Sequence, residues 1–258
     1  MPRVARGLAD GQIYHVLNRG NGRQNVFHKE GDFQAFLRLL GETKERYGIK
    51  VFAYCLMSNH FHLLLQTEEG QELGRSMQWL MTSHVRRYHR HYGTSGHVWQ
   101  GRYKSFIVQQ DDHLLTVVRY IETNPVRAKM VDKAGDWPWS SYRERTVTGT
   151  GFEPSEMPVP FGGQTTADEQ WDKVVGAGQA PLGPVPGVTL DPLPVSVTGD
   201  WAAFIGQPIS AKEEAGLRQS FERQAPFGSE TWKEKIGRLL GLESTMRPKG
   251  RPRKSLGK

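Results

Sequence analysis

Hydrophobic and polar positions alternate along the first 125 residues with two different periods. Four short runs rich in apolar, β-branched and aromatic residues predict strands, at residues 11–19, 49–57, 60–67 and 97–109. Three longer runs place apolar side chains three or four residues apart and predict helices, at residues 30–48, 71–93 and 111–125. The predicted order is strand, helix, strand, strand, helix, strand, helix.

This order predicts an α+β fold of the ferredoxin-like kind, in which helices lie largely on one face of an antiparallel sheet. The second and third strands are separated only by Ser58 and Asn59, so we expect them to form a tight antiparallel hairpin. The other face of such a sheet is expected to be free to carry a site.

Two histidines open the second strand of this hairpin, in the sequence SNHFHLLLQ at residues 58–66. Successive side chains of a strand point to opposite faces, so His60 and His62 share one face while Phe61, Leu63 and Leu65 share the other. One face of the strand is therefore apolar, and the other carries two imidazoles.

The chain changes character after residue 150. Residues 151–200 contain 8 Gly and 8 Pro and predict a linker rather than a packed core. Two short amphipathic helices follow, ISAKEEAGLRQSFERQ and SETWKEKIGRLLGL, and MRPKGRPRKSLGK ends the sequence. We predict four parts: a domain over 1–148, an acidic Gly/Pro-rich linker over 149–200, a short helical module over 201–245 and a basic tail over 246–258.

The net charge of +7 is divided unevenly along the chain. Residues 1–150 hold 21 Lys and Arg against 14 Asp and Glu, residues 151–200 hold 1 against 7, and residues 201–258 hold 12 against 6. Two basic blocks around an acidic spacer favour a polyanionic partner, nucleic acid before membrane. A basic surface with no specific partner is the alternative that charge alone leaves open.

Composition excludes two kinds of site. The single cysteine, Cys55, excludes a disulfide framework and a cysteine-based zinc site within the chain, and it suits a reducing compartment. No run reaches the roughly 18 apolar residues of a membrane span, and the first residues lack the apolar core of a signal peptide. We therefore expect a soluble, cytoplasmic protein with no membrane partner.

His60 and His62 are the best candidates for a metal site, because strand geometry directs both rings into one space. All nine histidines lie between residues 15 and 113, so metal or acid–base chemistry is expected in the first domain. The His-x-His pattern alone is weak. Two half-exposed histidines on a solvated sheet face are its alternative interpretation.

The predicted helix at 111–125 adds a phenol and an amide. Tyr120 and Asn124 are four residues apart and share one helix face, provided that the helix reaches Asn124. Pro125 disfavours helical angles at Asn124, so a kink or a cap there is an alternative. Two imidazoles and an amide oxygen suit Mg²⁺ or Mn²⁺ bound together with a substrate phosphate. On spacing alone, a core-facing tyrosine is an equal alternative for Tyr120.

Five sequence blocks, in this order, resemble the single-tyrosine HUH transposases of insertion-sequence type, and among them the REP-associated tyrosine transposases. The blocks are YHVLNRGNGRQNVF, LMSNHFHLLL, HVWQGRYKS, YIETNPVRAKMV and WPWSSY. The resemblance covers about residues 1–145. It continues from LRQSFERQ to RPRK, which looks like the tail of longer members of that group.

The resemblance implies roles for the matching residues. His60 and His62 match the paired histidines of the HUH motif, and Tyr120 matches the nucleophile that takes the 5′ phosphate of cleaved single-stranded DNA as a phosphotyrosine. Asn124 lies where relatives carry a third, amide-bearing metal ligand. The resemblance also implies cleavage and rejoining without ATP at palindromic REP repeats that fold into hairpins.

Nine further residues are candidates for DNA contact. Four cations near predicted strand ends suit phosphates, and two aromatic rings suit stacking on unpaired bases: Arg19, Arg23, Arg102, Lys104, Trp99 and Tyr103. In the tail, KGRPRK resembles an AT-hook that reads a narrow minor groove through Lys249, Arg251 and Arg253. Ordinary surface or core positions, and a nonspecific basic tail, are the alternatives.

The sequence therefore predicts a metal-dependent single-stranded DNA endonuclease and strand transferase. Its expected partner is single-stranded or hairpin DNA, with no small-molecule substrate, and it would act as a monomer or a homodimer. Two alternatives stay open. One is a DNA-binding architectural or regulatory protein that kept the fold. The other is a phosphoesterase in which water attacks and Tyr120 only packs.

Overall fold

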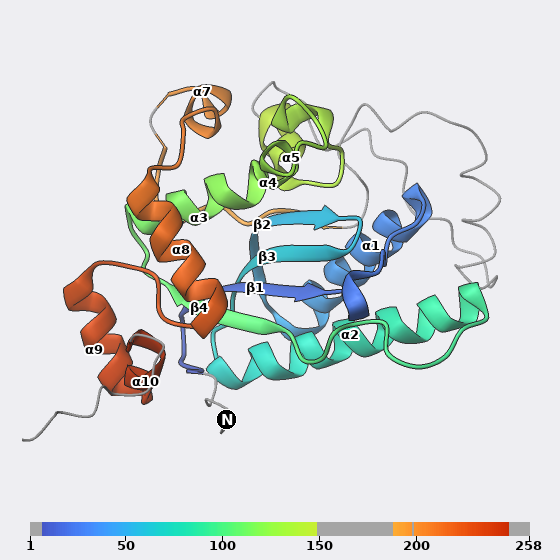
Figure 1. The fold of residues 1–258 in the computed structure, drawn as a ribbon, viewed down its shortest axis with the longest axis horizontal. Coiled ribbons are helices and arrows are strands. Elements are labelled where there is room, and N and C mark those ends of the chain that lie inside the picture. The colour runs from blue at the N-terminus through green and yellow to red at the C-terminus, as the bar shows by residue number, and fades with distance from the viewer. Residues whose placement is uncertain (1–6, 149–187, 198, 248–258) are drawn as a thin grey trace, which may run out of the picture.

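A computed structural model describes residues 7–148, 188–197 and 199–247 of the chain. At its centre is a four-stranded antiparallel sheet with the strand order β2-β3-β1-β4. The strands are β1 (Ile13–Arg19), β2 (Lys50–Met57), β3 (His60–Gln66) and β4 (Lys104–Val108). This is the order of a ferredoxin-like sheet, so the α+β prediction is confirmed (Figure 1).

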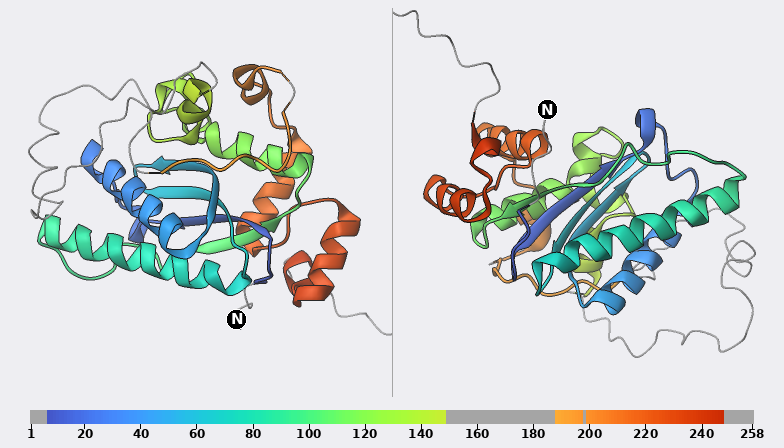
Figure 2. Two further views of the ribbon diagram at one scale, coloured as in Figure 1. Left: turned by 180° about the vertical axis from the view of Figure 1, so that it is seen from behind. Right: turned by 90° about the horizontal axis from the view of Figure 1, so that it is seen from below.

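Two long helices cover one face of the sheet, as the view from below in Figure 2 shows. They are α1 (Glu30–Tyr47) and α2 (Gly70–Tyr92), and each ends at a glycine in the left-handed conformation, Gly48 (φ 61°) and Gly93 (φ 62°). Such a glycine stops a helix because it adopts a positive φ without a Cβ clash. The apolar side of β3, with Phe61, Leu63 and Leu65, packs into this layer.

The other face of the sheet is covered as well, which differs from the expected open face. Two helices lie on it, α3 (Asp112–Glu122) and α8 (Ala211–Arg223). A second apolar cluster joins them to the sheet, with Phe52, Leu64, Val117, Ile121 and Leu217 among its members. The sheet is therefore the middle layer of three, and segments far apart in the sequence close its second face.

The remaining elements are short. They are η1 (Asn21–Arg23), α4 (Asn124–Arg127), η2 (Ala134–Asp136), α5 (Ser141–Thr148), α7 (Trp201–Ile205), α9 (Glu230–Leu240) and α10 (Glu243–Met246). The chain around Asp191 runs beside β2, where the Asp191 carboxylate accepts a hydrogen bond from the Val51 amide at 2.7 Å and pairs with Lys44. No helix among the described residues is long and apolar enough to cross a membrane.

The fourth strand is shorter than the predicted segment 97–109. Trp99 makes only an isolated bridge to Gly20, and regular pairing begins at Lys104. Gly96 (φ 96°) and Gly101 (φ 141°) take backbone angles that an extended strand does not use. The alternation of apolar and polar residues at 97–103 comes from a loop that buries Val98 and Trp99.

Truncation of a buried leucine in the helix-covered layer is expected to destabilise the fold. Leu63 is completely buried, so Leu63→Ala should lower the free energy of unfolding by about 2–5 kcal/mol, from lost burial and the cavity left behind. Urea denaturation followed by circular dichroism measures this. The control is Met130→Ala at a residue 42% exposed, which should change stability by less than about 0.5 kcal/mol.

Candidate active site

The two histidines of β3 lie side by side on the face that α3 and α8 cover. Their ring centroids are 5.1 Å apart and the rings are nearly perpendicular, at 82°. Phe61 between them is completely buried on the opposite face. The strand alternation predicted from SNHFHLLLQ is therefore what brings the imidazoles together.

Tyr120 reaches the same place from the last turn of α3. Its ring centroid lies 5.7 Å from that of His62. The helix ends at Glu122, and Asn124 opens the separate short helix α4. The break follows from Pro125, which has no N–H for the helical ladder. The Thr123 amide still bonds to the Arg119 carbonyl at 3.0 Å, so the chain keeps helical direction and Asn124 stays one turn beyond Tyr120.

Asn124 is the residue that joins these groups. Its amide nitrogen lies 3.3 Å from His62 Nε2, and its side chain also bonds to His60 and to Tyr120. Asn59 holds the other side of His60, with its Oδ1 2.6 Å from His60 Nδ1. Two imidazoles, an amide and a phenol thus converge within one chain. They are the side chains of the three residues predicted as metal ligands and of the predicted nucleophile.

Burial keeps both imidazoles neutral. It lowers the pKa of His60 to about 4, with repulsion from Arg19 acting in the same direction and the Asn124 hydrogen bond opposing it. Burial also holds the pKa of His62 well below its ordinary value, reinforced by His15, His60 and Arg19. Neutral imidazole is the form that binds a metal ion, because its nitrogen lone pair is free.

The phenol of Tyr120 is protonated at neutral pH. Burial raises its pKa, while the Arg127 guanidinium and the Asn124 hydrogen bond act against that rise. The Arg127 guanidinium lies 4.8 Å from the centroid of the Tyr120 ring. A protonated phenol is a weak nucleophile, so a nucleophilic role for Tyr120 would require a further positive charge nearby.

The donor set fits a divalent ion that also binds oxygen from a substrate. Among the described residues, no group of three or more His, Cys, Asp or Glu side chains could hold a metal ion. The candidate ligands at this site are instead His60, His62 and the amide oxygen of Asn124. Two nitrogens and one oxygen leave coordination positions open, as in sites where a metal meets a phosphate.

A third histidine, His15 of β1, belongs to this site and was missed in the sequence. It is completely buried, and its Nε2 lies 3.0 Å from His62 Nδ1. Strand alternation does place His15 on the face of β1 that is opposite to the face of the core residues Tyr14 and Val16. What the sequence does not show is that β1 pairs with β3, with Leu17 opposite His62. Local patterns cannot predict this pairing, because the two strands are far apart in the sequence.

Phe221 of α8 covers the site and was also missed. Its ring centroid lies 4.9 Å from Tyr120, 5.1 Å from His15 and 6.0 Å from His62. Polar contacts fix α8 there, since Glu213 binds Arg119 at 3.0 Å and Glu214 binds Arg127 at 3.1 Å. No local signal marks Phe221, which comes 101 positions after Tyr120 in the sequence.

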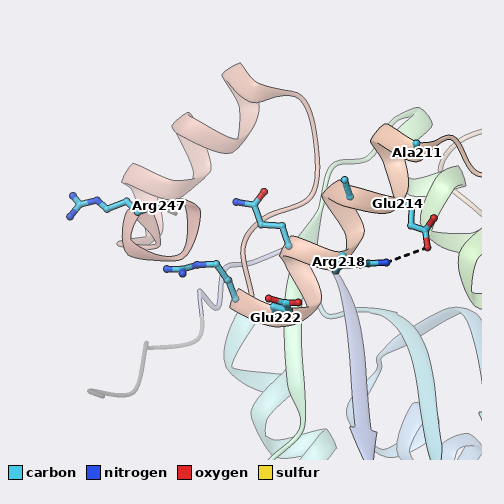
Figure 3. Close-up of a pocket in the computed structure, with 8 residues that line it drawn as sticks. Ala211, Glu214, Arg218, Glu222 and Arg247 are labelled. Carbon is cyan, nitrogen blue, oxygen red and sulfur yellow. Dashed lines mark ion pairs between the residues drawn. The ribbon is translucent and has the colours of Figure 1, made fainter. Parts of the chain in front are cut away.

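The outer side of α8 is polar. Figure 3 shows a hollow there whose lining includes Glu214, Arg218, Glu222 and Arg247, with Arg218 reaching back to Glu214. The hollow measures about 500 Å³. Both acidic and basic side chains line it. The opposite, apolar side of α8, with Leu217 and Phe221, faces the sheet.

The predicted DNA contacts divide into three groups. Arg19, Arg23, Arg102 and Lys104 are exposed, and Arg19 pairs with His60 across the sheet. Trp99 and Tyr103 are 5% and 7% exposed and pack in the apolar cluster under α2, as the alternative of ordinary core positions expects, and their contact with DNA stays a prediction. Lys249, Arg251 and Arg253 lie outside the described residues.

Trp99, Arg102 and Tyr103 nevertheless line one common groove. It runs between α2 and the 96–103 loop, with a volume of about 940 Å³. Its rim includes Arg75 and Arg86, its floor includes Met77 and Met81, and no Asp or Glu lines it. The loop lies at the end of β1, where Gln100 N donates to the Arg19 carbonyl at 2.8 Å.

Comparison with known proteins agrees with the resemblance to insertion-sequence transposases found in the sequence. Residues 9–124 match the family described as "Transposase IS200 like", and this range holds both histidines of β3, Tyr120 and Asn124. The resemblance recognised in the sequence is therefore confirmed for this part of the chain.

More particular relatives are REP-associated tyrosine transposases. A Haemophilus influenzae protein of that name is 30% identical over 112 residues, which cover 39% of this chain and 63% of the relative. The chain thus spans less than two thirds of that relative's length. An Escherichia coli K12 REP-associated tyrosine transposase is 19% identical over 168 residues, covering 65% of this chain and 94% of the relative.

Two solved structures are also similar. One is a REP-associated tyrosine transposase bound to a REP hairpin, 18% identical, with a TM-score of 0.48 over 64% of this chain and 94% of the other. The second is a transposase from Deinococcus radiodurans R1, 20% identical, with a TM-score of 0.33 over 47% of this chain and 97% of the other.

Proposed function

We propose that the protein is a metal-dependent single-stranded DNA endonuclease and strand transferase, a transposase that cleaves and rejoins DNA at hairpin-forming REP-type repeats. The observation that carries the proposal is the convergence of Tyr120, His60, His62 and Asn124 within one chain. Convergence within one chain also supports a site that is complete in a monomer.

Tyr120 is the nucleophile in this mechanism. Its oxygen bonds to the phosphorus of the scissile phosphodiester, the bond from phosphorus to the 3′ oxygen breaks, and a 5′-phosphotyrosine forms. The proton that the phenol loses balances the one that the leaving 3′ hydroxyl gains. Attack by a 3′ hydroxyl on the phosphotyrosine reverses these steps and rejoins DNA, so the phosphodiester energy is conserved without ATP.

His60, His62 and Asn124 would hold Mg²⁺ or Mn²⁺. When bound, such an ion would supply positive charge beside the phosphate and the phenol. Asn59 keeps the His60 ring in place through its 2.6 Å contact, and Arg127 adds a fixed positive charge beside the Tyr120 ring. The chain thus supplies orientation and charge around the reacting phosphate.

The proposal includes a path for DNA from this site past the end of β1. Arg19 lies between the histidines and the 96–103 loop, so an unpaired strand leaving the site would pass Arg19 and reach, on the α2 side of the sheet, the groove lined by Arg102. Arginines at its rim suit phosphates, and its apolar floor suits bases. The AT-hook-like tail, with Lys249, Arg251 and Arg253, would tether hairpin DNA and raise its effective concentration.

A denaturing gel tests the proposal. Purified protein, Mn²⁺ and a labelled single strand containing a REP-type hairpin should give a slow-migrating protein–DNA band and a free 3′ end. Absence of that band across a range of hairpins, despite tight hairpin binding, would favour the second candidate function. Cleavage with no protein attached would instead indicate attack by water.

The second candidate is a DNA-binding protein that does not cleave. The covered position of Tyr120 favours it, because the Phe221 ring, with its centroid 4.9 Å from that of Tyr120, occupies space next to the phenol. The two candidates differ in what should happen when this cover is removed.

We expect Phe221→Ala to speed formation of the protein–DNA band. The substitution removes an aromatic cover whose burial contributes about 1.5–3 kcal/mol. The population of the open site should therefore rise by a factor on the order of ten or more. Single-turnover gels measure the rate. The matched control is Phe204→Ala on α7, whose ring contacts Arg119 and Trp201 rather than the site and which should leave the rate unchanged. A purely DNA-binding protein would form no band in either variant.

A further inference from the structure

His15 is the buried group of this site that the proposed mechanism leaves without a role. It is completely buried in the middle of β1, between the rings of His62, Phe106 and Phe221. Its Nε2 contacts His62 Nδ1 at 3.0 Å. Its Nδ1 is buried and has no hydrogen-bond partner within the described part of the chain.

The hydrogen bonds around His62 define which nitrogen carries its proton. The Asn124 amide nitrogen can only donate, so His62 Nε2 accepts across 3.3 Å. A neutral imidazole has one N–H, which therefore lies on His62 Nδ1 and points to His15. His15 Nε2 is then the acceptor, and the His15 proton sits on Nδ1.

This arrangement keeps the proton off His62 Nε2, the nitrogen on the Asn124 side that would bind the proposed ion. Metal-binding histidines are commonly fixed in this way by an acceptor on their other nitrogen. Here the acceptor is a histidine from a neighbouring strand. We infer that His15 is a positioning residue, which accepts a hydrogen bond from His62 and so fixes the ring and tautomer of His62 for metal binding.

Packing alone does not account for a histidine at this position. A buried N–H without a partner is unfavourable, and an apolar ring would fill the same space without that cost. The neighbours Phe106 and Phe221 are of this apolar kind. A role in packing and a role as acceptor therefore predict different results for different replacements of His15.

The inference rests on the proposed function for its metal but can be tested without it. His15→Phe keeps a ring of similar size and removes the acceptor, whereas His15→Gln keeps an oxygen acceptor at about the same reach. In the full-length, metal-free protein labelled with ¹⁵N-histidine, NMR should show His62 protonated on Nδ1 in the original chain and in His15→Gln. In His15→Phe the Nε2–H form of His62 should appear.

Binding of Mn²⁺, followed by the EPR signal of the free ion, gives the second measurement. We expect His15→Phe to weaken binding by about 10- to 100-fold, and His15→Gln to restore most of that loss. Thermal melting checks folding, and His15→Leu replaces His15→Phe if the latter does not fold.

Each result supports one claim or overturns it. An unchanged His62 tautomer and an unchanged Mn²⁺ affinity in His15→Phe would overturn the role of His15. Absence of Mn²⁺ binding in every variant would overturn the metal dependence of the proposed function, and the NMR result would still decide the role of His15.

Discussion

Replacement of Tyr120 with phenylalanine is expected to abolish the covalent protein–DNA product. The variant keeps the ring that packs against His62 and Phe221 and loses only the attacking oxygen. Loss of a nucleophile should slow strand cleavage by a factor on the order of 10⁴ or more. Hairpin binding should weaken by less than about tenfold, because one neutral hydrogen bond contributes only about 1 kcal/mol.

Denaturing gels and fluorescence anisotropy measure these two quantities on the same hairpin. The matched control is Tyr47→Phe, which changes a tyrosine at the end of α1, on the far side of the sheet. It should cleave at the normal rate. A covalent band that persists in Tyr120→Phe would assign the nucleophile to another residue.

Replacement of His62 with alanine is the second large expected effect. It removes a proposed ligand and leaves His15 Nε2 without its partner, so Mn²⁺ binding and cleavage should fall together. We expect cleavage to slow by about 10³-fold or more, since the ion supplies several kcal/mol of charge stabilisation. Mn²⁺ titration and single-turnover gels measure the two losses.

The control for this variant is His91→Ala, at a half-exposed residue near the end of α2. It should change neither Mn²⁺ binding nor the cleavage rate. Tyr120→Phe should bind Mn²⁺ normally, so the two site variants fail for different reasons. Normal cleavage by folded His62→Ala would contradict the metal site.

Much of the fold follows from local sequence patterns. The helices at 30–47 and 70–92 and the hairpin at Ser58 and Asn59 have apolar spacing and turn residues that act over a few positions. The fourth strand was predicted too long, because burial of Val98 and Trp99 in a loop imitates strand alternation. Local patterns thus identify elements better than they identify what those elements pack against.

The candidate site divides in the same way. His60 and His62, and Tyr120 with Asn124, are related by short spacings that backbone geometry converts into proximity. His15 and Phe221 reach the site only through strand pairing and helix docking over long sequence distances. The burial of Trp99 and Tyr103 likewise depends on α2, which lies elsewhere in the sequence.

Mass spectrometry of the covalent product tests the central claim most directly. After cleavage of a hairpin substrate, nuclease treatment and trypsin digestion, residues 120–127 should be recovered as one peptide carrying a nucleotide joined through its 5′ phosphate to Tyr120. A nucleotide on any other residue, or cleaved DNA with no modified peptide, would contradict it.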